Sequence, residues 1–245
     1  MRRGARVRRV LVAAGLLLTL AAPAWGPPAW SHDIERAEAL LSDIAAYRRA
    51  AADGPTEPER AEATFRLGET TETLVAALNR DVAAHGRDVV GELLVRRLRA
   101  HGLEVAWAPR VNRYEYDLAA FADYLRRAPR GRWAPEAQFR LIARRFYATL
   151  GTDPATLVGT DVGALLAALA EEERFLGEHA SHERAGTVRF FLAVDHYRIA
   201  RNIPDPVRAR EHERRARQAL QHTVERSTEA FEVRAAQTLL ETLSR

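Results

Sequence analysis

The chain has no cysteine among its 245 residues, and all 37 of its basic residues are arginine, since lysine does not occur. Without cysteine no disulfide can hold the fold, so the chain must bury enough apolar side chains to be stable by itself. The same absence excludes a lipid-modified N-terminal cysteine. We interpret the lack of lysine as a bias in base composition rather than as a functional feature.

Long apolar stretches are also scarce, and residues 10–22 form a run of 13 that only Gly15 and Thr19 interrupt. This run follows five arginines and precedes the A-x-A triplet at 22–24, so residues 1–24 have the pattern of a cleavable secretory signal peptide. Thirteen residues are few for a membrane-spanning helix, which needs about 20. We expect an exported protein, periplasmic or, in a monoderm host, secreted, with membrane association only if the signal is retained.

The positive charge of the chain belongs mainly to this leader. The whole chain carries a formal charge of +4 at pH 7, and removal of the five arginines of residues 1–24, which contain no acid, leaves −1. A nucleic-acid-binding domain needs a basic patch on its folded surface. We therefore expect no nucleic acid among the partners, and no motif suggests a small-molecule substrate.

A 25-residue pattern occurs twice, 74 residues apart and without a gap. Residues 43–67 read DIAAYRRAAADGPTEPERAEATFRL, and residues 117–141 read DLAAFADYLRRAPRGRWAPEAQFRL. Each copy predicts a helix, a turn with proline and a second helix, and such a recurrence indicates stacked helical hairpins. We expect the final leucine of the second copy, Leu141, to be a core position. The positions identical to their counterparts are Asp43, Ala45, Ala46, Pro55, Glu62, Ala63, Phe65, Arg66 and Leu67.

Apolar residues at intervals of three and four predict amphipathic helices along most of the mature chain. Because these helices need no sheet, we expect an all-α protein of antiparallel helical hairpins stacked as a right-handed solenoid. One helical repeat domain at 33–245 would follow an extended segment at 25–32. The expected helices cover residues 34–52, 58–78, 81–99, 116–128, 135–150, 162–176, 183–202, 207–224 and 228–243, with a loop at 151–154.

Residues 81–113 interrupt the repeat. Gly102 follows the last periodic apolar residues of this stretch, so we place it as a helix C-cap. Leu103, Val105 and Trp107 then alternate with polar or small residues, which fits either a short strand or an extended loop. We favour the loop, because a lone strand would have no sheet to join.

The second copy resembles tetratricopeptide-type repeats (TPR). That family places Phe, a small residue and a helix-ending Pro at offsets of three and then five, and Phe121, Tyr124 and Pro129 have those offsets, although Tyr124 is larger than the usual alanine. Residues 124–147 are also similar to the envelope branch of the family, which includes the Tol-Pal-associated cell-division coordinator and the outer-membrane assembly lipoproteins. The Leu-Gly pair of that branch is kept at residues 67–68, but its glycine is replaced in the second copy.

The resemblance implies a superhelical stack whose concave surface holds extended or helical segments of other proteins. A single hairpin cannot bury its apolar stripe, so neighbours stack and the inner groove still faces solvent. We therefore expect a non-catalytic protein-binding scaffold of the bacterial cell envelope, with other envelope proteins as partners. The alternatives are an all-α superhelical enzyme that acts on the cell wall and a structural envelope protein without a stable partner.

The turn of the second copy supplies the candidate partner-binding residues. Its arginines fit an acidic partner segment, phospholipid headgroups or an anionic glycan, although we favour a solvated turn. For Trp107 and Trp133 we favour packing over a role as anchors in a groove. A second arginine run at 208–217 alternates with glutamates, which indicates pairing on an exposed face. The candidates are Arg126, Arg127, Arg130, Arg132 and Trp133.

The sequence indicates no catalytic, cofactor or metal site. His179 and His182 lie at a turn, and no histidine is part of an HExxH motif, so we interpret the histidines, including His196 and His212, as solvated or capping residues. The triplet Glu171–Glu173 cannot converge on one atom, because consecutive side chains on a helix point about 100° apart. We interpret the triplet as a solvated helix face. G-x-S-x-G and phosphate-loop motifs are absent as well.

Overall fold

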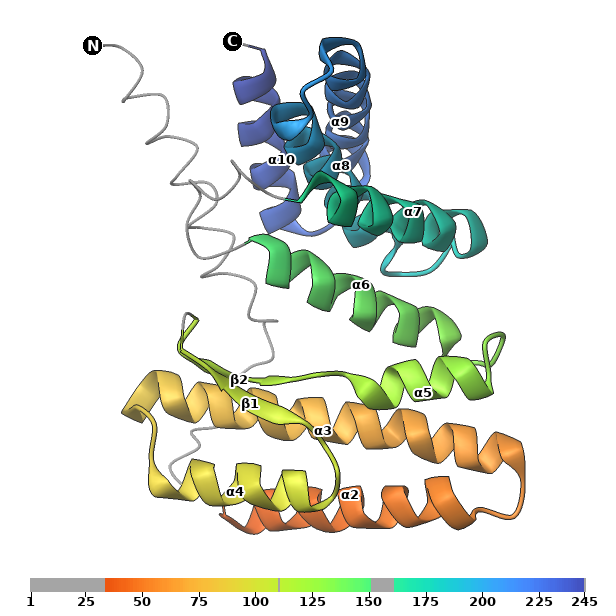
Figure 1. Cartoon of the computed structure of the whole chain (residues 1–245), viewed down its shortest axis with the longest axis vertical. Coiled ribbons are helices and arrows are strands. Elements are labelled where there is room, and N and C mark those ends of the chain that lie inside the picture. Colours follow the sequence, from red (N-terminus) through yellow and green to blue (C-terminus); the bar gives the residue numbers. More distant parts are fainter. Residues whose placement is uncertain (1–33, 110, 151–160, 245) are drawn as a thin grey trace. The chain divides into compact units, whose positions relative to one another are not determined.

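The computed structural model describes residues 34–109, 111–150 and 161–244 (Figure 1). Within these ranges the chain forms nine helices and two short strands, which confirms the expectation of a mostly helical protein. The expected signal peptide at 1–24, the extended segment at 25–32 and the loop at 151–154 lie outside them. The chain divides into two compact units, whose described parts are residues 34–141 and 142–244.

The secondary structure follows the order helix, helix, helix, β-hairpin and then helices only. None of the described helices is long and apolar enough to cross a bilayer. The division between the two units falls within α6. The elements are α2 Ile34–Asp53, α3 Glu57–His85, α4 Val89–Ala100, β1 Val105–Ala108, β2 Arg113–Tyr116, α5 Ala119–Arg127, α6 Ala134–Leu150, α7 Val162–Glu178, α8 Ala185–Asn202, α9 Pro206–Arg226 and α10 Ala230–Leu243.

Helix α3 begins with a capping box directly after α2 ends. The Thr56 backbone amide donates to Glu59 Oε2 at 3.1 Å, and the Glu59 amide donates to Thr56 Oγ1 at 3.4 Å. These bonds satisfy amides that the first turn of a helix leaves without partners. Pro58 lies within the same turn, where its missing N–H is not needed. Local sequence therefore fixes the reversal between α2 and α3.

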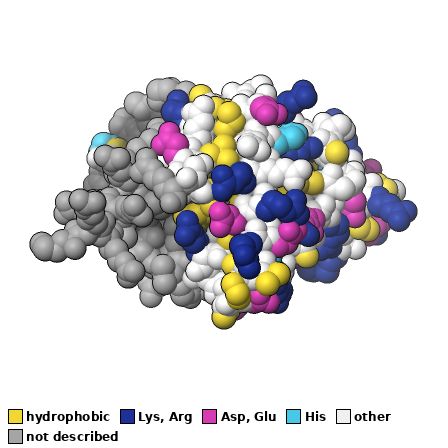
Figure 2. Space-filling model, turned by 90° about the horizontal axis from the view of Figure 1, so that it is seen from above, with side chains coloured by type: hydrophobic (Ala, Val, Ile, Leu, Met, Phe, Trp, Pro, Cys, Tyr) yellow, Lys and Arg dark blue, Asp and Glu magenta, His cyan; other side chains and the backbone are white. Residues whose placement is uncertain are grey.

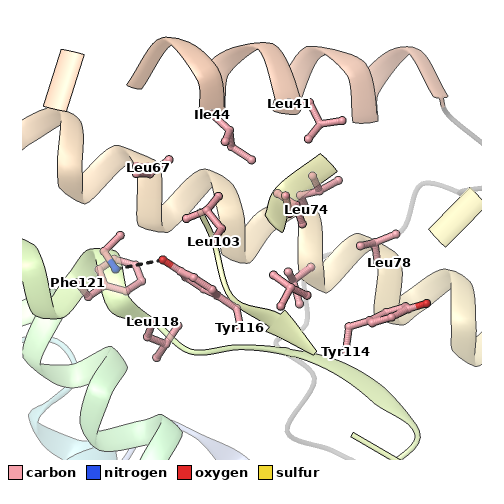
Figure 3. Packing of buried hydrophobic residues seen from close by; sticks show 14 of the residues in the cluster. Leu41, Ile44, Leu67, Leu74, Leu78, Leu103, Tyr114, Tyr116, Leu118 and Phe121 are labelled. Carbon is pink, nitrogen blue, oxygen red and sulfur yellow. Dashed lines mark hydrogen bonds between the residues drawn. The ribbon is translucent and has the colours of Figure 1, made fainter. Parts of the chain in front are cut away.

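The core of the N-terminal unit lies between α2, α3, the β-hairpin and α5. In Figure 3, Leu41 and Ile44 point from α2 toward α3, and Tyr116 and Phe121 approach α3 from another side. All four side chains are buried, as is Leu74 of α3. Burial of one such apolar side chain stabilises the fold by about 1.5–3 kcal/mol. This shared core explains why the two copies of the repeat belong to one unit.

The expectation of a loop after Gly102 is wrong. Residues 105–108 form β1, which pairs antiparallel with β2 in the register Val105–Tyr116 and Trp107–Tyr114. The missing partner strand is supplied by the next few residues of the chain. The hairpin is marginal by itself, and it is stabilised here because β2 lies on α3, where Asn79 holds the backbone of Tyr114.

The placement of Gly102 as a helix C-cap residue is confirmed. Its backbone has φ +69°, a left-handed conformation that favours glycine. The Gly102 amide donates to Arg99 O at 2.8 Å and the Leu103 amide donates to Leu98 O at 3.2 Å, which is the Schellman arrangement. Leu98 and Leu103 both join the core, so the end of α4 also directs the chain into β1.

Helix α5 begins later than expected, at Ala119 rather than at residue 116. Tyr116 ends β2, and Leu118 adopts φ +62°. The Tyr116 hydroxyl accepts from the Ala120 amide at 3.2 Å, and Asp117 Oδ1 accepts from the Ala119 amide at 3.0 Å. The first turn of α5 is thus capped by the side chains of Tyr116, the last residue of β2, and of Asp117, which follows it. The dashed line in Figure 3 marks the bond to the Tyr116 hydroxyl.

Both copies of the repeat form a helix, a turn and the start of a second helix. The first copy spans the end of α2, its turn and the start of α3, and the second spans α5, its turn and the start of α6. The repeated Glu and Arg form the same ion pair in both copies, Glu62–Arg66 at 3.0 Å and Glu136–Arg140 at 2.8 Å. The similarity in sequence therefore reflects a shared helix, turn and helix, although the first two residues of the second copy precede α5 whereas those of the first copy lie within α2.

The C-terminal unit is built around α8, which packs against α7, α9 and α10. The surface of α8 is buried on most sides, and α8 accordingly carries many large apolar residues. Phe146 of α6 stacks on Phe191 of α8 with 4.0 Å between the ring centroids. The expected helix pairs 162–176 with 183–202 and 207–224 with 228–243 correspond to α7 with α8 and to α9 with α10.

Candidate functional site

The arginine turn, which we define as Arg126, Arg127, Arg130 and Arg132, connects α5 with α6. Arg126 forms an ion pair with Asp123 one turn earlier, and Arg127 Nη1 lies 3.2 Å from Glu57 Oε1 at the start of α3. Arg130 and Arg132 are exposed and form no ion pair within the described ranges. These two arginines are therefore the members of the turn with charge left for a partner.

The backbone of the arginine turn is tightly fixed. The Trp133 amide donates to the Tyr124 hydroxyl at 2.9 Å, and the Gly131 amide donates to Ala128 O at 2.9 Å. A Cβ at Gly131 would lie 2.4 Å from the same Tyr124 hydroxyl, so only glycine fits here. The turn therefore presents its two outer arginines from a backbone that these hydrogen bonds hold in place.

Trp133 packs within the N-terminal unit. Its ring stacks on Phe65 with 5.0 Å between centroids and 8° between planes, and its Nε1 donates to Glu62 Oε2 at 2.5 Å. The guanidinium groups of Arg66 and Arg132 lie 4.6 and 4.5 Å from its ring centroid. Trp133 thereby connects the second copy of the repeat to the first. A role for it in partner binding remains a prediction.

Trp107 also packs. It meets Tyr114 edge-on across the β-hairpin with 5.1 Å between centroids, and the Arg87 guanidinium lies 5.0 Å from its centroid. The Tyr114 hydroxyl donates to Glu92 Oε1 at 2.6 Å, and the same oxygen accepts from Arg87 at 2.5 Å. These contacts fasten the hairpin to α4.

The interpretation of Glu171–Glu173 as a solvated face is wrong for its central residue. Glu172 is 1% exposed, whereas Glu171 is half-buried with an ion pair to Arg145 at 2.6 Å, and Glu173 is exposed. The three side chains do point in different directions, as helix geometry requires. One of those directions leads into the interior of the C-terminal unit.

Glu172 belongs to a buried charged cluster, which we define as Glu172 of α7 with Asp195 and Arg198 of α8. Arg198 Nη1 donates to Asp195 Oδ1 at 3.0 Å, and Asp195 and Arg198 are also almost completely buried. Glu172 Oε2 and Asp195 Oδ2 have no hydrogen-bond partner among the residues that the structure describes. Such carboxyl oxygens are costly to bury in the ionised form.

The buried surroundings raise the pKa values of both carboxyl groups in the cluster. Burial, helped by the neighbouring Asp195, raises the pKa of Glu172 well above its ordinary value. Burial also raises the pKa of Asp195, although the Arg198 guanidinium acts against it. A carboxyl group kept protonated at neutral pH can donate a hydrogen bond. Because all three side chains are buried, solvent-borne substrates do not reach them in this conformation.

Two histidines that we interpreted as solvated or capping residues meet inside the C-terminal unit. His196 of α8 is 2% exposed, and its Nδ1 lies 2.9 Å from Nδ1 of the half-buried His212 on α9. By contrast, His179 ends α7, and His182 Nδ1 accepts from the Arg184 amide at 3.2 Å. The interpretation is therefore correct for His182, but it is wrong for His196 and for the His179 side chain, whose Nε2 is buried without a hydrogen-bond partner among the described residues.

A metal site finds no support in the residues that the structure describes, because no group of three or more His, Asp or Glu side chains there converges in a way that could hold an ion. A catalytic zinc site needs about three protein ligands. The two histidines on α8 and α9 fall short of that number.

The expected pairing of the arginine run on α9 is confirmed for Arg214, Arg215 and Arg217, whereas Arg210 donates to the carbonyl of Pro206 instead. Arg214 and Arg215 both contact Glu211, and Arg217 contacts Glu213. The hydrogen bonds from Arg214 and Arg215 lower the pKa of Glu211 to about 2. Figure 2 shows arginine and acidic side chains interspersed on one face of the molecule, without a large field of one sign.

One signal in the sequence could have revealed the buried polar residues. Helix α8 is apolar on most of its sides, and a helix of that kind is buried. Asp195, His196 and Arg198 therefore had to be buried with it, and buried charged groups need partners. Which residues of α7 and α9 provide those partners depends on how the helices pack.

Comparison of the chain with models of protein families, with curated proteins and with solved structures finds no match. Its function is therefore inferred from its own residues.

Proposed function

We propose that this chain is an exported, non-catalytic protein-binding scaffold of the bacterial cell envelope. In this proposal residues 1–24 are a signal peptide, and the hairpins stack in the manner of a right-handed TPR-like solenoid. The partner is another envelope protein with an acidic segment, which contacts the arginine turn.

The observation that carries the proposal is the repetition of one ion-paired hairpin. The pairs Glu62–Arg66 and Glu136–Arg140 occupy the same position in the two copies, on α3 and on α6. Each pair joins residues four apart on one helix, and its recurrence supports a repeated hairpin of the kind that stacks on its neighbours. Stacked hairpins offer a long surface for other chains and do not require a catalytic centre.

The arginine turn supports the choice of an acidic partner. Arg130 and Arg132 are exposed on a fixed loop, and the neighbouring Arg126 and Arg127 are already neutralised by Asp123 and Glu57. A turn whose backbone is already held by hydrogen bonds loses little backbone freedom on binding. Arginine also forms bidentate contacts with carboxylates.

A cell-wall enzyme is the main alternative, and the burial of the charged cluster speaks against it. Glu172 and Asp195 are the carboxyl groups with the most strongly perturbed environment in the C-terminal unit, but each is about 1% exposed. A glycosidase requires its two carboxyls to flank the sugar bond. A polysaccharide could not approach a pair enclosed by helices.

Site-specific photo-crosslinking in cells tests the proposal. A photoreactive amino acid at position 127 of the full chain, which leaves Arg130 and Arg132 in place, should capture one discrete envelope protein, which is then identified by mass spectrometry. The variant Arg130→Glu/Arg132→Glu, with the photoreactive group at position 127, should lose this product. Mass analysis of the exported protein also shows whether residues 1–24 are removed.

The matched control is Arg80→Glu, which reverses an exposed arginine on α3 outside the turn. Capture that persists in Arg80→Glu and disappears in Arg130→Glu/Arg132→Glu supports the scaffold. Equal capture in all forms would remove the arginine turn from the interface. No captured protein in any form would favour a structural role without a stable partner, and release of fragments from cell-wall material would favour the enzyme.

A further inference from the structure

The contact between His196 and His212 joins two helices through a pair of ring nitrogens. His196 lies in the middle of α8 and His212 in the second turn of α9, and their Nδ1 atoms are 2.9 Å apart. The ring centroids are 5.1 Å apart, so the rings point nearly head-on at each other along the N···N line. Two imidazoles in this position share one hydrogen, which one Nδ1 donates and the other accepts.

The head-on arrangement fits a shared proton better than a shared metal ion. Nitrogens that bind one ion must converge on a point beside the line that joins them, whereas these rings point along it. The charged neighbours also do not favour a cation. Arg215 lies near both rings and Arg208 lies near His212, and these positive charges oppose a bound cation. The carboxylates of Glu211 and of Glu173 on α7 act in the other direction.

The pair tolerates one extra proton but not two. If His212 becomes an imidazolium, it still donates Nδ1–H to the lone pair of His196. If both rings are charged, two N–H groups face each other at 2.9 Å, and the hydrogen bond is replaced by repulsion between like charges. Protonation of the second ring therefore works against the contact between α8 and α9.

We propose that the pair His196–His212 is an acid-sensitive latch that holds α9 against α8. When the latch opens, the buried side of α9, which includes Ala216 and Leu220, separates from α8. An apolar face that is hidden at neutral pH then becomes accessible. This inference does not depend on the proposed scaffold function.

The direction of the titration agrees with the geometry. Burial, the neighbouring His212 and Arg215 lower the pKa of His196 from 6.5 to about 4, and burial, Arg215 and Arg208 lower the pKa of His212 as well. Between pH 6.5 and 4 the unfolded chain therefore binds more protons than the folded one. The stability that comes from the neutral pair is present above pH 6.5 and is lost as the pH falls toward 4.

The test compares the full chain with His196→Gln/His212→Gln, in which two amides can still form a hydrogen bond but cannot become charged. Urea unfolding is followed from pH 7.5 to pH 4, together with hydrogen exchange of α8 and α9. Below pH 6.5 the folding equilibrium constant of the wild type should fall relative to the variant by about ten-fold per pH unit. Amides of α9 should lose protection in the wild type before those of α7.

Two further variants keep the test decisive if the double variant does not fold. His212→Gln changes only the half-buried ring and should weaken the acid response, whereas His222→Gln, at an exposed site on the same helix, should leave it as in the wild type. Equal pH dependence in His212→Gln and His222→Gln would overturn the latch, as would an acid response in which α9 and α7 lose protection together.

Discussion

Asn79 of α3 holds both backbone groups of Tyr114 in β2. Its Oδ1 accepts from the Tyr114 amide at 2.6 Å, and its Nδ2 donates to the Tyr114 carbonyl at 2.9 Å. In the register of the hairpin these two backbone groups point away from β1. The side-chain amide thus takes the place that a third strand would occupy, and it attaches the hairpin to the helix.

Replacement of Asn79 should loosen the hairpin. Asn79→Ala leaves a buried N–H and C=O without partners, so we expect a loss of about 1–3 kcal/mol in the free energy of unfolding. Asn79→Asp can still accept from the amide, but its second carboxylate oxygen then faces the Tyr114 carbonyl oxygen, so it should give a loss at least as large. Urea denaturation measures both, with Arg80→Ala as the exposed neighbour. Equal stability of Asn79→Ala and Arg80→Ala would contradict the prediction.

Gly68 is required by the approach of Phe121. A Cβ at this position would lie 2.9 Å from Phe121 Cζ, so Gly68→Ala should lower the free energy of unfolding by about 1–3 kcal/mol, although alanine is the better helix former. Gly91→Ala is the matched control, because its Cβ would meet no atom closer than 3.4 Å. Thermal unfolding should show a lower Tm for the first variant and an equal or higher Tm for the second.

Leu67 and Leu141 end the two copies of the repeat but are not equally buried. Leu67 is buried, whereas Leu141 is only partly buried beside the same cluster, so our expectation of a full core position at Leu141 was too strong. Leu67→Ala should cost about 2–5 kcal/mol. Leu141→Ala should cost roughly 1–2 kcal/mol, since less area leaves water. Chemical denaturation of the two variants side by side decides this, and a larger loss for Leu141→Ala would refute it.

Glu172 should lower the free energy of unfolding of the C-terminal unit as the pH rises above neutral. Its pKa is raised in the folded chain, so above the ordinary value of 4.5 the folded chain binds more protons than the unfolded one, and stability falls as the pH rises. Glu172→Gln removes this dependence, and its advantage over the wild type should grow by up to about 1.4 kcal/mol per pH unit.

Unfolding measured between pH 7 and 9 isolates this effect, because the histidine pair acts in the opposite direction and only below pH 6.5. Glu171→Gln is the adjacent control, since Glu171 is half-buried and paired with Arg145. If Glu172→Gln retains the alkaline slope of the wild type, then Glu172 does not hold its proton in the folded chain.

The sequence predicts what depends on neighbours along the chain. The C-cap at Gly102 and the pairing of Arg214 and Arg215 with Glu211 both involve residues at most five positions apart. Each is decided by local geometry, and each can be read from spacing alone.

What could not be predicted depends on contacts between distant elements. The strand β1 was missed because its hairpin is stabilised by Asn79, which lies 35 residues before Tyr114. Glu172 lies in a run of three identical side chains, and only the position of α8 decides which of them is buried. The contact between His196 and His212 likewise requires that α8 and α9 pack in one particular register.

The hydrogen bonds at the two outer edges of the β-hairpin have a consequence for solubility. An exposed strand edge is a template on which another chain can add a strand, and proteins that leave such edges open tend to aggregate. Here Asn79 occupies the edge of β2 at Tyr114, and Arg99 Nε donates to the carbonyl of Val105 on the edge of β1 at 2.8 Å. Two polar side chains therefore occupy backbone groups to which the strand of another chain would otherwise form hydrogen bonds.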